Sequence, residues 1–386
     1  MLALDLRRRA LLPELESLRA ERNQASEAIA AAKRAGEDTT AAIARMRELG
    51  EREKQLEPEL AAVQAQLDAT LIALPNLPSA DAADEDTVIR AVGEPRSGPA
   101  ADHLELAGAL IDMEAAARLS GARFAYLKGD LVMLELALVR WALERLRAQG
   151  FEPVIPPVLV REQALYGTGF LPDTEQQIYR LADDELFLVG TSEVALAALH
   201  AGEILDAASL PLRYAGFSSC FRREAGAAGK DTRGIFRVHQ FDKVEMFVFT
   251  TAAQAAAEHE RILAIEESLL GELEIPYRVV NIAVGDLGAS AAKKYDCEAW
   301  LPGQERYREL TSCSNTTDYQ ARRLEIRVRE AAGRPATAHT LNGTAVAVGR
   351  TIIALLENHQ REDRSVVLPQ CLVEFGAPAV ISQHGS

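Results

Sequence analysis

Apolar side chains recur at heptad spacing along the first 74 residues, which contain no Trp, Tyr or Phe. The first seam consists of Leu4, Leu11, Leu15, Leu18, Ala25, Ile29 and Ala32. The second seam consists of Ala42, Met46, Leu49, Leu56, Leu60, Val63, Leu67 and Leu74. Steps of three, four and seven residues place each set on one face of a helix. The pattern therefore predicts two long amphipathic helices.

The segment GEDTT, residues 36–40, separates the two seams. Gly36 favours a helix end, and Asp38, Thr39 or Thr40 is a suitable cap for the next helix. A chain that folds back here brings the seams into register as an antiparallel hairpin. Each helix of about 30 residues would then be about 45 Å long.

The register of this hairpin can be stated residue by residue. The expected neighbours are Ile29 and Met46, Leu18 and Leu56, and Leu15 and Leu60. Two prolines interrupt the pattern. Pro13 is expected to begin the first helix proper, and Pro58 is expected to kink the second helix or mark its weak point.

The rest of the chain changes character. Residues 76–103 are rich in Pro, Gly and Asp, which predicts a linker. Helical patterns follow at 129–149, 252–272, 317–332 and 347–359. Strand-like runs lie at 154–160, 185–189, 214–222, 236–249, 276–284, 306–312 and 366–373. Several strands succeed one another without a helix, which favours an α+β fold with an antiparallel or mixed sheet.

Composition narrows the function classes. The 386 residues suggest two or more domains, and the formal net charge of −15 disfavours indiscriminate nucleic-acid binding. The cysteines form no CxxC pair, so neither a zinc site nor a disulfide framework is expected. There is no signal-like N-terminus and no run of 18 apolar residues, so we predict a cytoplasmic protein without a membrane partner. No Walker A loop or GxGxxG follows a strand.

Residues 217–249 carry six cationic residues and four carboxylates within an apparent strand pair. Alternation places Phe241 and Glu245 on one face, with valines and a methionine on the other. Arg222 is suited to a phosphate or carboxylate, and Glu224 to an exocyclic amine. The pattern indicates a site for an anionic ligand that carries a planar base. The alternative is a solvated sheet with cross-strand ion pairs.

Several motifs in this order resemble the seryl-tRNA synthetases, a family of class II aminoacyl-tRNA synthetases. GARFAYLKGDL and GFEPVIPPVLV resemble motif 1, at about 121–160. FRREAG and GKDTRGIFRVHQFDKVEMF resemble motif 2, at about 217–249. LNGTAVAVGRTIIALLENHQ resembles motif 3, at about 341–360, and YGTGFLP, GTSEVAL and RELTSCSNTTDYQARR also match the family.

The resemblance implies a fold and a domain division. The family's fold is an antiparallel sheet of six or seven strands with flanking helices, preceded by a two-helix coiled-coil arm. Residues 1–75 would form a tRNA-binding arm, 76–103 a linker and 104–386 the catalytic domain. The resemblance further implies a homodimer.

The resemblance also implies a serine pocket. Its members would be Thr191, Ser192, Glu193, Arg222, Glu245 and Thr344. In this assignment Glu245 holds the ammonium or hydroxyl of serine, and Thr344 stands where the family usually has Ser.

For ATP the resemblance implies a second group of residues. Its members would be Arg222, Glu224, Arg237, Val238, Phe241, Glu309, Leu310, Thr311, Ser312 and Arg350. Arg222 would grip the α-phosphate and Arg350 the γ-phosphate, so these two are the predicted catalytic residues. Phe241 would stack on adenine, and Glu309 with Ser312 would bind Mg²⁺.

The implied reaction joins L-serine and ATP into seryl-adenylate and then transfers serine to tRNA(Ser), with tRNA(Sec) as a second expected acceptor. No side-chain nucleophile is needed, since arginines and Mg²⁺ can offset the repulsion between two anions. Exposed basic residues of the arm would contact tRNA phosphates, and the candidates are Arg19, Arg22, Lys33 and Arg34.

Three features depart from the family pattern. The chain begins with MLALDLRRR, close to where the first arm helix is expected to be under way, so a leading segment is expected to be missing. Pro58 lies inside the second helix, and LNGTAV replaces the more usual LNGSGL. Two alternatives stay open: a specialised paralogue that uses seryl-adenylate or seryl-tRNA in a biosynthetic or resistance pathway, and a non-catalytic binding protein on the same fold.

Overall fold

The computed structural model describes residues 1–172, 177–225, 229, 231–329 and 333–382. The chain divides into two compact units, Met1–Leu74 and Pro75–Ser386. Across the described residues, no helix is both long enough and apolar enough to cross a membrane.

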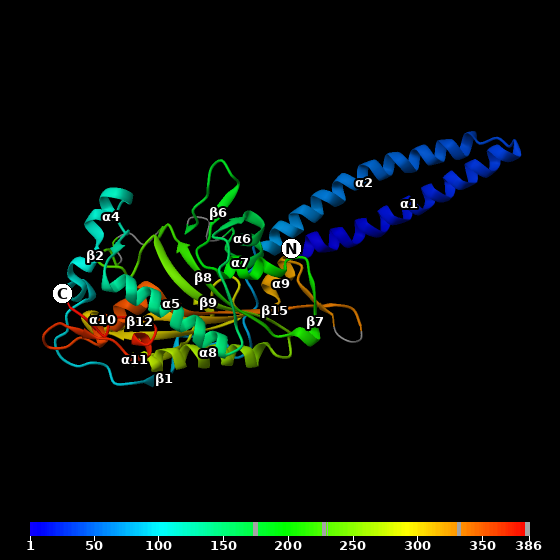
Figure 1. The fold of residues 1–386 in the computed structure, drawn as a ribbon. Helices are drawn as coiled ribbons and strands as arrows, with labels where there is room; N and C mark the ends of the chain where they lie inside the picture. The colour runs from blue at the N-terminus through cyan, green and yellow to red at the C-terminus, as the bar shows by residue number, and fades with distance from the viewer. Residues whose placement is uncertain (173–176, 226–228, 230, 330–332, 383–386) are drawn as a thin grey trace. The chain divides into compact units, whose positions relative to one another are not determined.

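The first unit is an antiparallel pair of helices, α1 (Leu2–Ala35) and α2 (Thr40–Ile72), coloured blue in Figure 1. Gly36 ends α1 in the left-handed conformation with φ of 76°, and the Glu37 amide closes back on the Ala32 carbonyl at 3.0 Å. Asp38 then accepts a hydrogen bond from the Thr40 amide at 2.9 Å. The predicted turn is therefore confirmed.

The predicted seams form the interface between α1 and α2. Leu11, Leu15 and Leu56 are buried, and Leu18, Leu60 and Val63 pack against them. The expected neighbours of Leu15 and Leu18 on α2 thus lie in the same cluster. Glu53 is also buried in this interface, and it pairs with both Arg19 and Arg22 across the two helices.

The two prolines do not divide the helices. The prediction that Pro13 begins the helix proper is wrong, because α1 already starts at Leu2 and Pro13 lies inside it. Pro58 likewise lies inside α2, which continues to Ile72. A proline inside a helix removes one backbone hydrogen bond, and here the long apolar seam on either side keeps both helices continuous.

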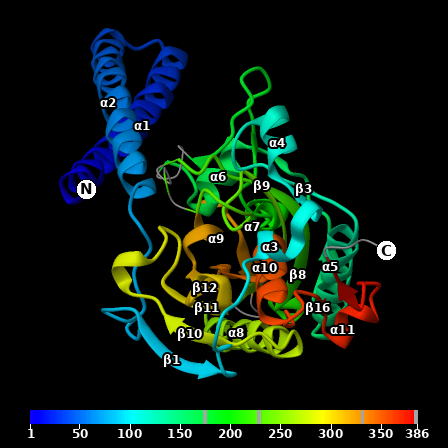
Figure 2. The same ribbon diagram turned by 90° about the vertical axis from the view of Figure 1, so that its left-hand side faces the viewer.

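The second unit is built on an eight-stranded sheet (Figures 1 and 2). In spatial order its strands are β1 (Thr87–Val92), β10 (Tyr277–Asn281), β11 (Lys293–Leu301), β12 (Arg306–Thr317), β15 (His339–Ala347), β9 (Gln240–Thr250), β8 (Leu212–Phe221) and β4 (Glu152–Val154). All neighbours are antiparallel except β4 and β8, which are parallel. The predicted α+β fold with an antiparallel sheet and flanking helices is confirmed.

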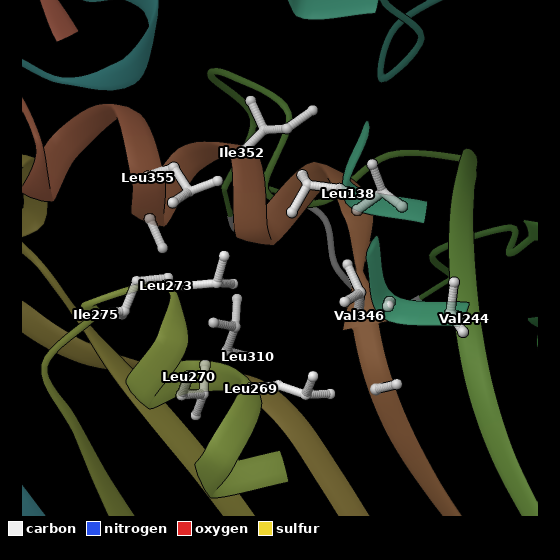
Figure 3. Packing of buried hydrophobic residues seen from close by; sticks show 14 of the residues in the cluster. Leu138, Val244, Leu269, Leu270, Leu273, Ile275, Leu310, Val346, Ile352 and Leu355 are labelled. Atoms are coloured by element: carbon white, nitrogen blue, oxygen red, sulfur yellow. The ribbon is translucent and has the colours of Figure 1, made fainter. Parts of the chain in front are cut away.

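Three long helices cover one face of this sheet: α5 (Asp130–Ala148), α8 (Ala255–Glu272) and α10 (Val348–Asn358). Figure 3 shows the core between them, where Leu269 and Leu270 of α8 and Leu273, which follows α8, belong to one cluster with Ile352 and Leu355 of α10. Burial of such side chains provides the main driving force for folding of this unit.

Shorter helices pack on the opposite face of the sheet. The short helices α6 (Glu162–Thr168), α7 (Glu193–Ala197) and α9 (Tyr319–Arg323) pack there. Leu196 of α7 lies in one cluster with Phe247 and Phe249 of β9.

Smaller elements complete the unit. The remaining helices are α3 (His103–Ala107), α4 (Met113–Ser120) and α11 (Gln370–Val373). The remaining strands are β2 (Ile111–Asp112), β3 (Tyr126–Leu127), β5 (Leu159–Arg161), β6 (Leu186–Leu188), β7 (Ile204–Asp206), β13 (Arg327–Arg329), β14 (Ala336–Thr337), β16 (Val366–Val367) and β17 (Val380–Ile381).

Several sequence predictions need correction. The helix predicted at 317–332 ends at Arg323, because Glu325 takes a left-handed φ of 57° and the chain continues as β13; residues 330–332 lie outside the described ranges. The strand predicted at 366–373 ends at Val367 and is followed by α11. The strand predicted at 154–160 is divided into β4 and β5 around two prolines.

Other segments differ in where strands begin. The strand predicted at 236–249 starts at Gln240. β11 and β15 were not predicted, since their alternation combines polar residues on one face with Gly, Cys and Ala on the other. Residues 76–103, expected to be a linker, contribute β1 to the edge of the sheet, where it pairs with β10.

Gly343 of β15 provides a test of the packing between α8 and the sheet. A Cβ there would overlap Ile262 and lie 2.9 Å from Glu266 Oε1. We expect Gly343→Ala to lower the free energy of unfolding by about 1–3 kcal/mol, as overpacking does. Denaturant unfolding followed by circular dichroism measures the change.

Gly271→Ala is the matched control. Gly271 lies in α8, the helix that packs on Gly343, and no atom lies within 4 Å of the position that its Cβ would take. This variant should be neutral or slightly stabilising, since Ala is the better helix former. Equal unfolding midpoints for the two variants would contradict the packing described.

Candidate active site

One face of the central sheet is polar, and its register explains why. Across β8, β9 and β15, the residues Gly216, Glu245 and Thr344 lie opposite one another. Lys243 lies opposite Ser218 on the same face. The intervening residues of β9, such as Val244, point into the core beneath, as the alternation in the sequence predicted.

Two β-bulges bring further side chains to this face. The register of β11 against β12 shifts so that Leu310 is the extra residue between Glu309 and Thr311. Glu309 and Ser312 are three residues apart and would face opposite sides of a regular strand, yet both line the same cavity. A second shift, at Ala345, does the same for Thr344 and Ala347 of β15.

These side chains surround a cavity of about 100 Å³. Its lining residues are Arg222, Glu224, Ile235, Phe236, Arg237, Val238, Phe241, Lys243, Glu309, Leu310, Ser312, Thr344, Ala347, Gly349 and Arg350. The structure thus brings together ten residues predicted for ATP, serine or metal binding.

The other predicted residues lie beside or behind this cavity. Thr191, Ser192, Glu193 and Glu245 are buried next to it, on α7, the turn before α7 and β9. Thr311 differs, because its side chain points to the helix face and donates a hydrogen bond to Glu266 at 2.8 Å. Its hydroxyl is therefore not part of the cavity wall.

Arg222 enters the cavity from the end of β8. Its Nε donates to the Gly190 carbonyl at 3.2 Å, and its guanidinium lies 5.5 Å from the centre of the Phe241 ring. The neighbouring Arg223 has its amide bonded to the Gln177 carbonyl and does not belong to the cavity lining found in the described residues. One nitrogen of the Arg222 guanidinium is thus held by the backbone, and the side chain lines the cavity.

Arg350 is the second predicted catalytic residue and lies in the first turn of α10. Its side chain lines the cavity. Its Nη1 donates to the Glu309 carbonyl at 3.0 Å and lies 3.5 Å from the Glu309 carboxylate. Burial alone would raise the pKa of Glu309, but the charges of Arg350 and Lys294 hold it below its ordinary value. Glu309 is therefore ionised at neutral pH and able to bind a cation.

Glu224 and Arg237 lie on the two sides of the motif 2 loop and form an ion pair. Arg237 Nη1 donates to Glu224 Oε2 at 2.8 Å. Glu224 has a left-handed φ of 50°, which is uncommon for a residue with a side chain. Residues 226–228 and 230 of the loop lie outside the described residues.

A buried acid pair lies at the deep end of the site. Glu245 is paired with Lys243 at 2.5 Å, and the Thr344 hydroxyl donates to it at 3.4 Å. Glu193 is also buried, and its Oε1 accepts hydrogen bonds from Gln320 and Asn342 at 2.8 and 2.9 Å. Burial and the nearby charge of Glu245 raise the pKa of Glu193 to about 7.

The hydroxyls of the TSE segment have local partners. Thr191 Oγ1 accepts from the Glu193 amide at 3.2 Å, and Ser192 Oγ donates to the Gly216 carbonyl at 3.3 Å. The first contact closes the turn before α7, and the second joins this turn to β8.

Sequence reasoning missed several residues of the site. Lys243 shares the face of Phe241 and Glu245, so alternation alone could have indicated it. Phe236, whose ring contacts the guanidiniums of Arg308 and Arg350, precedes a residue that was predicted. Gln320 and Asn342 come from distant segments, and nothing in their local sequence points to Glu193.

No group of three or more His, Cys, Asp or Glu side chains that could hold a metal occurs in the part of the chain that the structure describes. Glu309 and Ser312 supply two oxygen donors on one side of the cavity. Such a pair suits Mg²⁺, which commonly takes one or two protein oxygens and completes its shell with water and phosphate.

Comparison with protein families identifies the class of this fold and site. The description "tRNA synthetase class II core domain (G, H, P, S and T)" matches residues 177–359, which include the cavity and the acid pair. The second unit is therefore the core of a class II aminoacyl-tRNA synthetase.

The first unit and the full-length relatives narrow the class to one family. Residues 1–78 match the "Seryl-tRNA synthetase N-terminal domain". The serine–tRNA ligase of Acidothermus cellulolyticus is 54% identical over 97% of this chain and 90% of the relative, and that of Mycobacterium avium is 50% identical over 100% and 92%. The chain belongs to the seryl-tRNA synthetase family, and it is thus an aminoacyl-tRNA ligase.

Solved structures agree with this assignment. The crystal structure of seryl-tRNA synthetase from Pyrococcus horikoshii, complexed with ATP, is 43% identical. It superposes with a TM-score of 0.94 and covers 100% of this chain and 93% of that chain.

Glu193 generates a prediction about pH. In the unfolded chain its pKa is near the ordinary value of about 4.3, whereas in the folded state it is about 7. Between these values the folded state holds a proton that the unfolded state releases, so the free energy of unfolding falls as pH rises, by up to about 3 kcal/mol. Glu193→Gln should remove this loss, since both amide donors converge on Oε1 and can be kept.

Urea unfolding of the wild type and Glu193→Gln at pH 5 and pH 8 measures this difference. The free energy of unfolding of the variant, minus that of the wild type, should be larger at pH 8 than at pH 5. An identical pH dependence in both proteins would show that Glu193 is not protonated on folding.

Proposed function

We propose that the chain activates L-serine with ATP to form seryl-adenylate and diphosphate, and then transfers serine to the 3′ end of tRNA(Ser). The observation that carries this proposal is the cavity itself. Two arginines, Arg222 and Arg350, line it from different elements, and the buried acids Glu193 and Glu245 lie at its deep end. Cations for phosphates and acids for an ammonium thus lie side by side.

The mouth of the cavity is suited to ATP, the ligand of the related Pyrococcus structure. The exposed part of the Phe241 ring offers a stacking surface for adenine, with Arg350 facing the other side of the base. Glu224 accepts from the exocyclic amine, while Arg222 binds the α-phosphate and Arg350 the γ-phosphate. Arg237 and the backbone of Val238 complete the ATP wall, which continues along β12 from Glu309 to Ser312.

Mg²⁺ would be held by Glu309 and Ser312 together with phosphate oxygens. When bound, it neutralises phosphate charge and stabilises the leaving diphosphate. The chain's own contribution is to keep both ligands on one face through the bulge at Leu310.

Serine would bind where Glu245 now meets Lys243. The serine ammonium replaces the Lys243 ammonium as the partner of Glu245, and the serine hydroxyl reaches Thr344 or Glu193, positioned by Thr191 and Ser192. Arg222 then draws the serine carboxylate toward the α-phosphorus. Charge develops on the phosphate oxygens during this in-line attack, and fixed arginines stabilise it without reorganisation.

Glu245→Ala tests the serine pocket. Loss of a charge-assisted contact to the ammonium should lower serine-dependent ATP–diphosphate exchange roughly 100-fold, mainly through the KM for serine. ATP binding, measured by calorimetry, should persist because the ATP wall is unchanged.

Glu258→Ala is the matched control for this variant. Glu258 is also buried and paired with an arginine, Arg213, but it lies on α8 against the helix face of the same sheet. It should leave the KM for serine unchanged. Normal exchange by Glu245→Ala would refute the pocket, and absence of exchange in the wild type would refute activation of serine altogether.

The arm is assigned to tRNA binding. The division proposed is that of the sequence analysis, with residues 1–75 as the arm, 76–103 as the linker and 104–386 as the catalytic domain. Arg19 and Arg22 are engaged with Glu53, whereas Lys33 and Arg34 are exposed in the last turn of α1. Phosphate contacts are therefore best assigned to Lys33 and Arg34, with Arg19 and Arg22 available only if their ion pairs open.

Charge reversal at the end of α1 tests this assignment. Lys33→Glu combined with Arg34→Glu should raise the KM for tRNA(Ser) roughly tenfold in serylation assays at moderate salt. Serine-dependent ATP–diphosphate exchange should stay at the wild-type rate. Arg8→Glu with Arg9→Glu is the matched control at the other end of α1, where both arginines pair with Asp5. Equal effects of the two double variants would contradict a tRNA contact at Lys33 and Arg34.

Three further assignments complete the proposal. A homodimer is supported by a hollow of about 460 Å³ in the motif 1 region, which is lined in part by the exposed side chains of Leu119, Tyr126 and Leu136.

The protein is proposed to act in the cytoplasm, and tRNA(Sec) is proposed as a second acceptor. ATP–diphosphate exchange without charging of tRNA would instead favour the specialised paralogue.

A further inference from the structure

Three segments meet behind the cavity, around the imidazole of His103. These are α3, the returning end of the motif 2 loop at residues 233–235, and the second half of α10, which lies beside α3 in Figure 2. The Ile235 amide donates to His103 Nε2 at 3.3 Å. On the other side of the ring, His103 Nδ1 lies 3.2 Å from Glu357 Oε1.

The hydrogen bonds fix the state of the ring. A backbone amide can only donate, so Nε2 must accept and the ring proton must be on Nδ1, where it donates to Glu357. The Glu357 carboxylate also accepts from the amides of His103 and Gly303, at 3.2 and 2.9 Å. His103 is 5% exposed and Glu357 is fully buried, so loss of one of these partners is costly.

The backbone around the ring leaves no room for another arrangement. Gly234 has a left-handed φ of 83°, and a Cβ there would overlap the imidazole. A Cβ on Gly303 would lie 3.0 Å from Glu357 Oε2. Arg233 pairs with Asp102, which also caps α3 through the amides of its first turn.

The amide held by His103 is next to residues of the ATP wall. Ile235 is followed by Phe236 and Arg237, which both line the cavity. The Phe236 ring lies 3.7 Å from the guanidinium carbon of Arg308 and 4.6 Å from that of Arg350. A shift of the Ile235 backbone would therefore displace two cavity side chains and the neighbours of Arg350.

We propose that His103 is a positioning residue for ATP, which acts through the Ile235 amide to fix the returning end of the motif 2 loop. This inference rests on the proposed binding of ATP in the cavity. His103 touches no substrate. Its neutral Nδ1–H form links α10, which carries Arg350, to the loop that carries Phe236 and Arg237.

Two substitutions separate the hydrogen bonds of the ring. His103→Gln places an amide oxygen near the position of Nε2 and keeps an acceptor for Ile235, whereas His103→Asn keeps only a donor near Nδ1. We expect His103→Asn to raise the KM for ATP roughly tenfold in ATP–diphosphate exchange, with the KM for serine changed less than twofold. His103→Gln should stay within about threefold of the wild type.

His359→Asn is the matched control, because His359 also makes one hydrogen bond to backbone, to the Leu273 carbonyl at 2.8 Å, just after the end of α10 and away from the motif 2 loop. It should lower the melting temperature without changing the KM for ATP. Equal KM values for ATP in His103→Asn and His103→Gln, beside an active wild type, would overturn the inference. An inactive wild type would overturn the proposed function instead.

The tautomer of the His103 ring in the wild-type protein tests the inference without the need for a folded variant. Nitrogen-15 NMR of histidine-labelled protein at pH 8 should show the resonances of the His103 ring with its single proton on Nδ1. A His103 ring with its proton on Nε2 cannot accept from the Ile235 amide, and this result would overturn the inference even if His103→Asn failed to fold.

Discussion

The alignment of β9 between β8 and β15 is the constraint on which the rest of the molecule depends. It sets Lys243 and Glu245 on one face of the sheet and Val244 and Met246 on the other. The apolar face is closed by α5, α8 and α10, and their packing fixes the strands. A slip of one residue would exchange the two faces, so the same packing that stabilises the fold also assembles the site.

The site nevertheless needs two departures from a regular sheet. The bulges at Leu310 and Ala345 let residues three apart, such as Glu309 and Ser312, face the same cavity. Alternation in the sequence correctly predicted the faces of β9, and the heptad seams correctly predicted the arm. It could not predict the bulges, because these depend on the partner strand. β11 and β15 were missed because their polar residues alternate mainly with small ones, and residues 76–103 did not reveal that they supply an edge strand.

The partners of the buried acids are a second feature that the local sequence does not predict. Glu193 accepts hydrogen bonds from Gln320 and Asn342, which are more than 100 residues away in the sequence. Glu245 forms an ion pair with Lys243 and accepts a hydrogen bond from Thr344. Burying such groups opposes folding, so the surrounding hydrogen bonds must compensate for lost hydration. A small polar ligand with an ammonium and a hydroxyl can replace these contacts, whereas an apolar amino acid would leave them unsatisfied. The motifs correctly predicted membership of the family, but the contacts that support each motif residue came only from the three-dimensional structure.

A crystal structure with a non-hydrolysable seryl-adenylate analogue, in which a sulfamate replaces the phosphate, tests the central claim most directly. That claim is that one polar sheet face holds the base and the amino acid of the same ligand. We expect the adenine against Phe241, the sulfamate at Arg222 and the seryl ammonium on Glu245 in place of Lys243. An analogue bound away from this face, or one that leaves the Lys243–Glu245 pair intact, would contradict the account.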